Sequence, residues 1–519
     1  MTTPMPERRA EDADIALLSE GTYPFVRGGV ASWTDQLIRA FPHYRFAVIF
    51  LGGNPSQYTG LQFELPDNVV HLETVYVHGP QKKPPITPIK GDGPLMTFMK
   101  ELHASFKDLG PKLFGERPID TMFPCLLERH EDLHREFLYS ESSWEYLREE
   151  YRLKCPDTSF VDYFWTVRSM HQPIWILACL AARLIPARVY HSISTGYAGF
   201  LGALLRHRTQ RPFILTEHGI YTKERKIDLF KAQWEAQKEF ATDQEIAAST
   251  YLRDLWVRFF EVLGKLAYDA ADPILSIYEA NRQVQMRDGA AAERTRVIPN
   301  GIDIRWLAPL RAKRPPSPPP ILCLLGRVVP IKDTSTFIRA MRTVVNRLPQ
   351  AEGWIVGTVD EDRDYAEECQ NLVETLGLSG KVKFLGHRKI DECLPKIGLL
   401  VLSSISEGLP LVILEGFAAG VPAVSTDVGA CRQLIYGAGE EENDVGAAGD
   451  VVGLANPTAL AEAALRLLTD PTKWREAQAV AIRRVETFYS QDRMIASYRH
   501  VYEEALAPWP ASALSSAKS

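Results

Sequence analysis

Two glutamates stand eight positions apart in the segment 403–429, which reads SSISEGLPLVILEGFAAGVPAVSTDVG. Glu407 precedes a Gly-Leu-Pro turn, and Glu415 lies in an apolar helix that we expect to start near Pro410 and to end at Gly420. At a rise of about 1.5 Å per residue the two carboxylates would lie roughly 10–12 Å apart. That separation is too large for one acid–base pair and suits gripping two ends of an elongated ligand through its hydroxyl groups. A helix cap and an unrelated glutamate would give the same spacing.

An arginine and a lysine follow a second apolar run. Gly326-Arg327 ends the predicted strand ILCLLGRV, and Lys332 stands five residues after the arginine. Open α/β sheets bind ligands at the carboxyl ends of their strands. The two cations could clamp a diphosphate there, the arginine as a fork and the lysine as a point charge. Two solvated surface cations are the ordinary alternative.

A pair of glycines, Gly28-Gly29, follows the first predicted strand and precedes a helical pattern. Two glycines let the backbone approach a ligand, and a helix N-terminus suits a diphosphate. A simple turn is the alternative. The full GxGxxG pattern is missing, which disfavours NAD as a ligand.

Three further features are weaker. His218, in the segment LTEHGIY, follows Glu217 at the end of another predicted strand, although a lone histidine is more often structural. Asn300-Gly301 in VIPNGID predicts a turn in which the glycine could take a positive φ. The acids from Asp360 to Asp364 match Asp-x-Asp twice, but they open a charged helix, so we interpret them as helix N-terminal acids and expect no metal.

The elements that must position these residues alternate between strands and helices, which predicts doubly wound parallel sheets. The first half should contain strands near Asp14–Leu18, Phe46–Phe50, Val69–Leu72, Val189–Ile193, Phe213–Thr216, Ile274–Ile277 and Thr295–Pro299, interrupted by an insertion at about 77–170. After a proline-rich, stiff connection at 310–320 a second series begins: ILCLLGRV, GWIVGTV, VKFLG, LLVLSS and AVSTDV. The chain should end with an amphipathic helix from about Ser490.

The composition is that of a globular enzyme. A chain of 519 residues implies more than one hydrophobic core, and a net charge of −6 argues against nucleic acid as the main partner. The seven cysteines form no CxxC pair, which favours thiols in a reducing compartment. The first residues have no apolar core typical of a signal peptide, and the most apolar stretch, 175–186, is too short to span a bilayer. We therefore expect a cytoplasmic protein.

The Glu-x7-Glu segment followed by GxPxVxxxxG resembles the signature of retaining glycosyltransferases of family 4. The resemblance implies a GT-B fold, two Rossmann-like doubly wound parallel-sheet domains facing a cleft: an acceptor-side domain at 1–305, a nucleotide-sugar-binding domain at 306–489, and a C-terminal helix at 490–519 that returns to the first domain. It also implies that Arg327 and Lys332 bind the diphosphate, and that Asn300-Gly301 lines the cleft as a hinge.

The segments SEGTYPFVRGGVASW and TEHGIYTKER, together with the insertion, look more specifically like the Pel exopolysaccharide glycosyltransferases of the PelF type. What this implies is a UDP-sugar donor, a growing polysaccharide as acceptor, and an inner-membrane export complex as partner. The placements of the motifs, together with the family 4 resemblance, predict the donor-site residues Gly28, Gly29, Arg327, Lys332, Glu407, Gly408, Leu409 and Glu415, with His218 near the reacting centre. No metal or other cofactor is implied.

The expected reaction proceeds with retention, the acceptor attacking from the face that UDP leaves. Three alternatives are a UDP-sugar epimerase of the same fold, a family 4 enzyme of lipid or glycogen type that differs only in its acceptor, and a noncatalytic UDP-binding scaffold.

Overall fold

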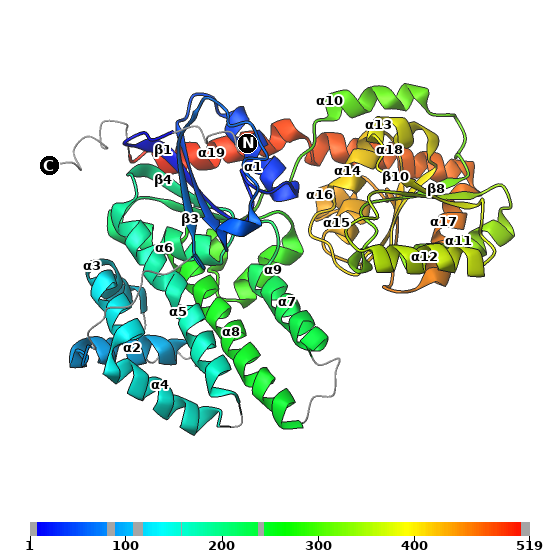
Figure 1. The fold of residues 1–519 in the computed structure, drawn as a ribbon. Helices are drawn as coiled ribbons and strands as arrows, with labels where there is room; N and C mark the ends of the chain where they lie inside the picture. Colours follow the sequence, from blue (N-terminus) through cyan, green and yellow to red (C-terminus); the bar gives the residue numbers. More distant parts are fainter. Residues whose placement is uncertain (1–7, 80–88, 107–117, 157, 237–242, 510–519) are drawn as a thin grey trace. The chain divides into compact units, whose positions relative to one another are not determined.

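The computed structural model describes residues 8–79, 89–106, 118–156, 158–236 and 243–509. They form two compact units, each with its own sheet (Figure 1). The first unit takes the residues up to Ser276, Arg282–Arg296, and the chain from His500 onward. The second takes Ile277–Asn281 and Val297–Arg499. The last helix, α19 (Gln491–Leu506), therefore contributes its first part to the second unit and its last part to the first.

The sheet of the first unit has the order β3-β2-β1-β4-β5-β6-β7, and its pairs from β3 to β6 are parallel. Its strands are nearly continuous apolar runs because both faces of the sheet are covered by helices. Every strand predicted in this half is present. The strands are β1 (Ala13–Glu20), β2 (Phe46–Gly52), β3 (Val69–Tyr76), β4 (Ala187–Ser192), β5 (Phe213–Glu217), β6 (Ile274–Ser276) and β7 (Thr295–Val297).

The helices of this unit connect and cover the strands. Those outside the insertion are α1 (Gly29–Ala40), α6 (Tyr197–Thr209), α7 (Tyr221–Ala236), α8 (Asp243–Ala270) and α9 (Glu279–Arg287), the last of which belongs to the first unit from Arg282 on. The helical pattern predicted after Gly28-Gly29 is α1, which already includes Gly29 as its first residue.

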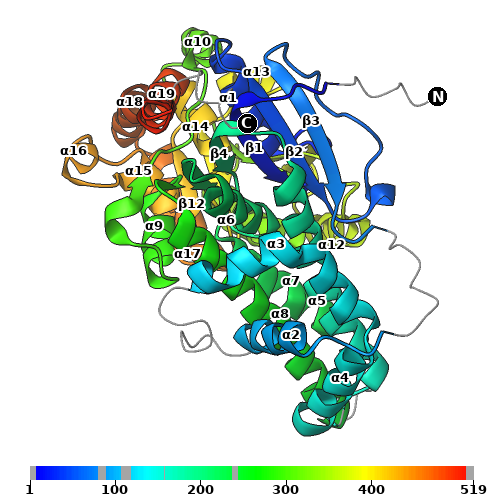
Figure 2. The same cartoon turned by 90° about the vertical axis from the view of Figure 1, so that its left-hand side faces the viewer.

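The insertion between β3 and β4 is helical where the structure describes it. Its helices are α2 (Gly93–Ser105), α3 (Pro118–Tyr139), α4 (Glu141–Lys154) and α5 (Phe160–Arg183). Figures 1 and 2 show α2, α3 and α4 gathered beside α5 at one end of the unit. Buried side chains from these helices, such as Met99, Phe123 and Trp175, join the same core as Leu18 of β1. The insertion is therefore part of the first unit's core; its residues 80–88, 107–117 and 157 lie outside the described residues.

The second sheet has the order β10-β9-β8-β11-β12-β13, and all of its pairs are parallel. Its strands are β8 (Ile321–Leu325), β9 (Glu352–Val356), β10 (Val382–Gly386), β11 (Leu399–Leu402), β12 (Ala423–Thr426) and β13 (Gly449–Val452). Sequence reasoning missed β13, since GDVV is short and opens with residues that disfavour strands.

Seven principal helices surround this sheet. They are α11 (Thr334–Arg347), α12 (Arg363–Thr375), α14 (Leu411–Ala418), α15 (Cys431–Tyr436), α17 (Pro457–Leu468), α18 (Pro471–Phe488) and the first part of α19.

Each sheet has one point where the strand order reverses. In the first, β1 lies between β2 and β4; in the second, β8 lies between β9 and β11. In open α/β sheets ligands bind outside the carboxyl ends of the strands at such a point. Ligand-binding residues are therefore expected in the loops that follow β1 and β4 and in those that follow β8 and β11.

The stretch 310–320 begins in a helical turn, although its composition predicts an extended connection, and the backbone becomes extended at Arg314. Ala308–Lys313 forms a 3-10 helix, and Arg311 Nε donates to the carbonyl of Ala418 at 2.7 Å. Arg314 donates to Ile397 O at 3.0 Å, and burial lowers the pKa of its guanidinium to about 10. The difference arises because these arginines satisfy backbone carbonyls of the second unit, which binds the segment to that unit's surface.

Within the described ranges no helix combines the length and the apolar character needed to cross a bilayer. All seven cysteines are described, and none forms a disulfide.

Candidate functional site

A lysine and a glutamate meet at the reversal point of the second sheet. Lys332 ends a short 3-10 helix, Pro330–Lys332, after β8, while Glu407 lies in the loop after β11. The Lys332 Nζ and Glu407 Oε1 atoms are 2.6 Å apart, and the two side chains are only 21% and 11% exposed. Ser404 Oγ also donates to Glu407 Oε1, at 2.5 Å. The structure thus brings together two residues that the sequence analysis had placed in separate motifs.

Backbone contacts fasten the loops that carry this pair. Ile405 N donates to Ile331 O at 2.8 Å, and Ser403 Oγ donates to Lys332 O at 2.9 Å. From the end of the neighbouring β12, Thr426 Oγ1 donates to Ser404 O at 2.6 Å. The carboxyl ends of β8, β11 and β12 therefore form one hydrogen-bonded platform.

The last glycine of the GxPxVxxxxG motif lies directly against the Glu407 turn. Gly429 has a φ of +53°, and a Cβ atom there would lie 2.3 Å from Gly408 O and 2.4 Å from Glu407 O. The next residue, Ala430, donates its N–H to Gly408 O at 2.8 Å. Only glycine permits this approach, which holds the Glu407-Gly408 backbone in place.

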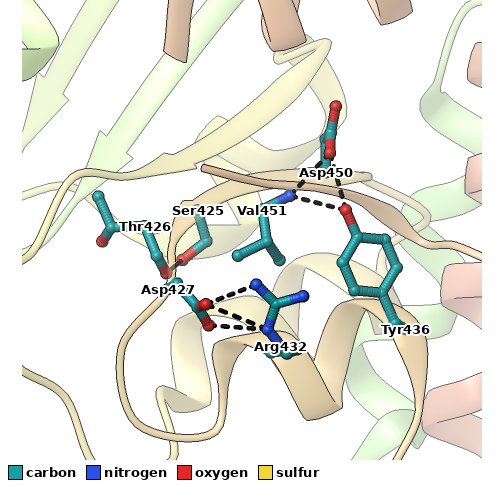
Figure 3. A network of polar contacts seen from close by, with 7 residues as sticks. All are labelled: Ser425, Thr426, Asp427, Arg432, Tyr436, Asp450 and Val451. Atoms are coloured by element: carbon teal, nitrogen blue, oxygen red, sulfur yellow. Dashed lines mark hydrogen bonds and ion pairs between the residues drawn. The ribbon is translucent and has the colours of Figure 1, made fainter. Parts of the chain in front are cut away.

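Beyond this glycine, a network of polar contacts fastens α15 to the ends of β12 and β13 (Figure 3). Arg432 forms a forked ion pair with Asp427, whose oxygens both lie 3.1 Å from Nε. Tyr436 OH donates to Asp450 Oδ1 at 2.8 Å, and Val451 N donates to the same carboxylate at 2.9 Å. Sequence reasoning missed this network; the five-residue spacing of Asp427 and Arg432 within TDVGACR was the signal available.

The predicted partner of Lys332 in the clamp, Arg327, has a different neighbour. Its guanidinium is exposed and lies 2.5 and 2.6 Å from the two carboxylate oxygens of Glu361. The acids around Glu361 include Asp362, which caps α12 by accepting the N–H of Tyr365 at 3.0 Å. The interpretation of this cluster as helix N-terminal acids is therefore confirmed for Asp362, while the Arg327–Glu361 pair was not foreseen.

Glu415 is on α14, which begins at Leu411 with Pro410 as its cap rather than as its first residue. Its carboxylate is half-buried and makes no hydrogen bond or ion pair with any described residue. Burial raises its pKa to about 7. A half-buried acceptor of this kind is suited to a ligand that brings its own hydroxyl donors. The Leu409 side chain, in contrast, packs in the core of the unit.

In the first unit, Gly28 caps α1 and Gly29 is its first residue. Neither has a φ that requires glycine, and a Cβ atom at either would meet nothing within 4 Å. The fold of the described chain therefore gives no steric reason for these two glycines.

His218 follows β5 and lies close to the same helix start. Its imidazole packs edge-on against the Trp33 indole of α1, with ring centroids 4.5 Å apart. Its Nε2 atom is buried and has no hydrogen-bond partner among the described residues, and burial lowers its pKa to about 4. The imidazole is therefore neutral at pH 7.

The two acids near His218 are engaged inside the unit. Glu217 is fully buried and accepts three hydrogen bonds. Glu20, at the end of β1, accepts from Tyr221 OH at 2.6 Å and from Ala198 N at 3.2 Å. Burial raises the pKa of both carboxyl groups. Glu20 was not singled out from the sequence.

Gly301 does not have the positive φ that the turn prediction allowed. A Cβ atom there would lie 2.4 Å from Ser490 O, so glycine is needed for a close backbone approach. Ile302 pairs with Ser490 in a parallel bridge, and Gly301 N lies 3.3 Å from Met494 Sδ. The neighbouring Asn300 is buried, and its Oδ1 has no partner among the described residues.

Comparison with known structures agrees with this architecture. A crystal structure of Anabaena HepE in complex with UDP covers 95% of this chain and 100% of its own, with a TM-score of 0.55 and 15% identity. HepE in complex with UDP-glucose superposes with a TM-score of 0.53. The predicted GT-B-type fold, two parallel doubly wound sheets, is confirmed.

Sequence relatives match parts of the chain. The lipopolysaccharide core biosynthesis mannosyltransferase LpsB of Rhizobium meliloti is 28% identical over 183 residues, 35% of this chain and 50% of its own. An exopolysaccharide phosphotransferase of Streptomyces coelicolor is 28% identical over 311 residues, 54% of this chain and 32% of its own. The chain thus spans half or less of the length of these two relatives.

Two family models account for most of the sequence. Residues 319–470 match the glycosyl transferases group 1, in agreement with the predicted enzyme class, a glycosyltransferase. Residues 13–293, more than half of the chain, match a domain of unknown function, DUF3492. The chain therefore belongs to the DUF3492 family, and its second half carries a group 1 glycosyl transferase domain.

Proposed function

We propose that the protein is a retaining glycosyltransferase that moves a hexose or an N-acetylhexosamine from a UDP-sugar to a growing exopolysaccharide of the Pel type. The observation that carries the proposal is the Lys332–Glu407 pair at the reversal point of the second sheet, inside the group 1 match. The HepE complexes with UDP and UDP-glucose support the donor class. The lipopolysaccharide and exopolysaccharide relatives support the product class. A cytoplasmic location beside an inner-membrane export complex is part of the same proposal.

The proposed role of Lys332 and Arg327 is to bind the diphosphate of the donor. Each is now paired with a carboxylate, Glu407 or Glu361 respectively. A diphosphate brings more negative charge than one carboxylate and would compete for both cations. As the glycosidic bond breaks, charge develops on the leaving diphosphate, and cations already in place stabilise that transition state.

Glu407 would then accept hydrogen bonds from hydroxyl groups of the donor sugar. Its Oε1 atom is held by Lys332 and Ser404, while no described residue donates to its Oε2. A carboxylate that is fixed through one oxygen keeps the other for a substrate hydroxyl. The Gly429 contact described above fixes the backbone on which this geometry depends.

Glu415 is proposed to bind the ribose. Its half-buried carboxylate lacks protein donors, and two adjacent ribose hydroxyls would supply them. Hydrogen bonds to the ionised form would offset the desolvation that raises its pKa to about 7.

From the first unit we propose two contributions. The open start of α1 at Gly28-Gly29 would accept the close approach of phosphate oxygens to backbone N–H groups. The neutral imidazole of His218 would hydrogen-bond a sugar hydroxyl near the reacting carbon. No residue is proposed as a covalent nucleophile, and attack on the face that UDP leaves accounts for retention.

The test is calorimetric titration of the wild-type protein with UDP, ADP and GDP, followed by incubation with UDP-sugars and an oligosaccharide acceptor. Selective UDP binding and acceptor-dependent release of UDP are expected. Interconversion of UDP-sugars without an acceptor would instead indicate an epimerase. Binding without turnover would indicate a scaffold, and failure to bind any nucleotide would overturn the donor site.

A further inference from the structure

We propose that Glu217 is a positioning residue that holds the His218 imidazole in place for the transfer reaction through the backbone they share. This inference rests on the proposed function, in which His218 contacts the sugar.

The first observation concerns how His218 itself is held. Apart from the edge-on packing against Trp33, its side chain makes no hydrogen bond to any described residue. An imidazole without such a bond takes its position from its backbone and from packing alone. The residues that fix the end of β5 therefore decide where His218 lies.

Glu217 fixes that end from one side. Its side chain is 1% exposed and accepts three hydrogen bonds, from Thr195 Oγ1 at 3.0 Å, Tyr268 OH at 2.6 Å and Gln285 Nε2 at 2.9 Å. The three donors come from the loop after β4, from α8 and from α9. One carboxylate thus joins β5 to three other elements, and a buried carboxylate that accepts three hydrogen bonds restrains the strand that carries it.

The opposite face of β5 is held one residue earlier. Thr216 Oγ1 lies 2.9 Å from His191 Nε2, and His191 Nδ1 lies 2.8 Å from Tyr502 OH of α19. Successive residues of a strand point to opposite faces. β5 is therefore clamped on both faces immediately before His218, and Glu217 supplies the clamp that is adjacent to it in the chain.

The activity test is a double-mutant cycle on the full-length protein with Glu217→Ala, His218→Ala and the double variant. Glu217→Ala is expected to lower kcat roughly 10- to 100-fold, and the double variant to be no slower than His218→Ala, because Glu217 acts only through His218. Multiplying losses in the double variant would overturn the proposal.

Two further variants separate positioning from general destabilisation. Glu217→Gln should restore most of the activity, since Gln285 Oε1 has no partner and can accept from the new amide after a flip of its own. Glu136→Ala is the matched control. Glu136 is a buried acid of the insertion, 4% exposed, that accepts the N–H of Asp92 at 2.9 Å. The substitution Glu136→Ala should lower Tm without lowering kcat. A loss of kcat equal to that of Glu217→Ala would contradict the inference.

A readout that does not depend on turnover keeps the inference separate from the proposed function. In protein labelled with ¹³C-histidine, the His218 imidazole resonance is identified by its absence in His218→Ala. The chemical shift of this resonance should change in Glu217→Ala, return to about the wild-type value in Glu217→Gln and stay at the wild-type value in Glu136→Ala. An unmoved resonance in Glu217→Ala would overturn the positioning role. If the wild type transfers no sugar while the resonance behaves as expected, only the proposed function fails.

Discussion

The Lys332 ammonium and the Glu407 carboxylate lie 2.6 Å apart although 75 residues separate them in the chain. They meet because β8 and β11 are parallel neighbours, paired at Cys323 and Leu400, so that the loops after them leave the same edge of the sheet. Because the pair is mostly buried, removing either partner leaves the other charge uncompensated. The pair therefore links the stability of the site to its proposed chemistry.

Replacing Lys332 or Arg327 by alanine should lower kcat by about 10²- to 10³-fold, the usual cost of losing one preorganised group that stabilises transition-state charge. Initial rates of UDP release, with circular dichroism to verify folding, measure this. Lys383→Ala is the matched control, because Lys383 pairs with Glu352 at 2.8 Å at the amino ends of β10 and β9 in the same sheet. Near-normal turnover in both site variants, or an equal loss in Lys383→Ala, would remove the clamp assignment.

UDP affinity should rise with pH through about 7 if the ionised form of Glu415 binds the ribose. Burial raises the pKa of this carboxyl to about 7, so the ionised fraction, and with it the association constant, should grow about tenfold between pH 6 and pH 8. Calorimetry at pH 6, 7 and 8 measures the change, and Glu415→Gln gives the baseline that includes titration of UDP itself. Parallel curves for the two proteins would rule out this role.

The Glu415 carboxyl group should also make the stability of the unliganded protein depend on pH. This stability should fall as pH rises, whereas the UDP affinity should rise. Its pKa is raised in the folded state, so its favourable contribution is complete below the unfolded pKa and is lost as pH rises through about 7. The free energy of unfolding of wild type should therefore fall relative to that of Glu415→Gln between about pH 4.5 and pH 7. Denaturant melts at three pH values test this, and a constant difference between the two proteins would contradict it.

Gly429→Ala should destabilise the second unit and weaken UDP binding together. The new Cβ would lie 2.3 Å from Gly408 O, and the backbone would have to give way at the turn that carries Glu407. We expect a loss of about 1–3 kcal/mol from strain and overpacking. Gly380→Ala is the control, since Gly380 also has a positive φ, +80°, but open space around it. It should cost about 1 kcal/mol and leave the UDP affinity unchanged; an equal loss of affinity in both would argue against the Gly429–Glu407 contact.

Gly29→Ala should lower the activity without lowering the stability. Gly29 is the first residue of α1 and has room for a methyl group, so Tm should stay the same or rise slightly. If phosphate oxygens approach this backbone, the methyl group should still lower kcat/KM by an order of magnitude or more. Gly93→Ala, at the first position of α2 with similar open space, should change neither quantity. Full activity in Gly29→Ala would remove the α1 start from the proposed donor site.

The strands of both sheets, apart from β13, were predictable because their apolar runs are buried on both faces and are bounded by glycine, proline and charged residues. The chemistry-bearing loops were predictable for a related reason: in a parallel sheet, polar residues that follow an apolar run stand at the ligand-binding edge. Lys332 and His218 were found in this way, whereas Glu407 was found by its spacing of eight positions from Glu415. The helical start of the segment 310–320 was not predicted, because proline content indicates local stiffness and not the backbone carbonyl groups to which Arg311 and Arg314 donate in the folded unit.

By itself the sequence determined which residues stand at strand ends, since hydrophobic periodicity and turn residues are local properties of the chain. Only the tertiary structure decided which strand ends are neighbours, because strand order depends on long-range packing. That order brings Lys332 to Glu407, whereas Arg327 forms an ion pair with Glu361. It also surrounds Glu217 with donors from three distant elements and leaves the Glu415 carboxylate half-buried without a described partner. The hydrogen-bond and ion-pair partners of a side chain and its degree of burial set its charge and its reactivity. Both come from contacts between residues far apart in the chain.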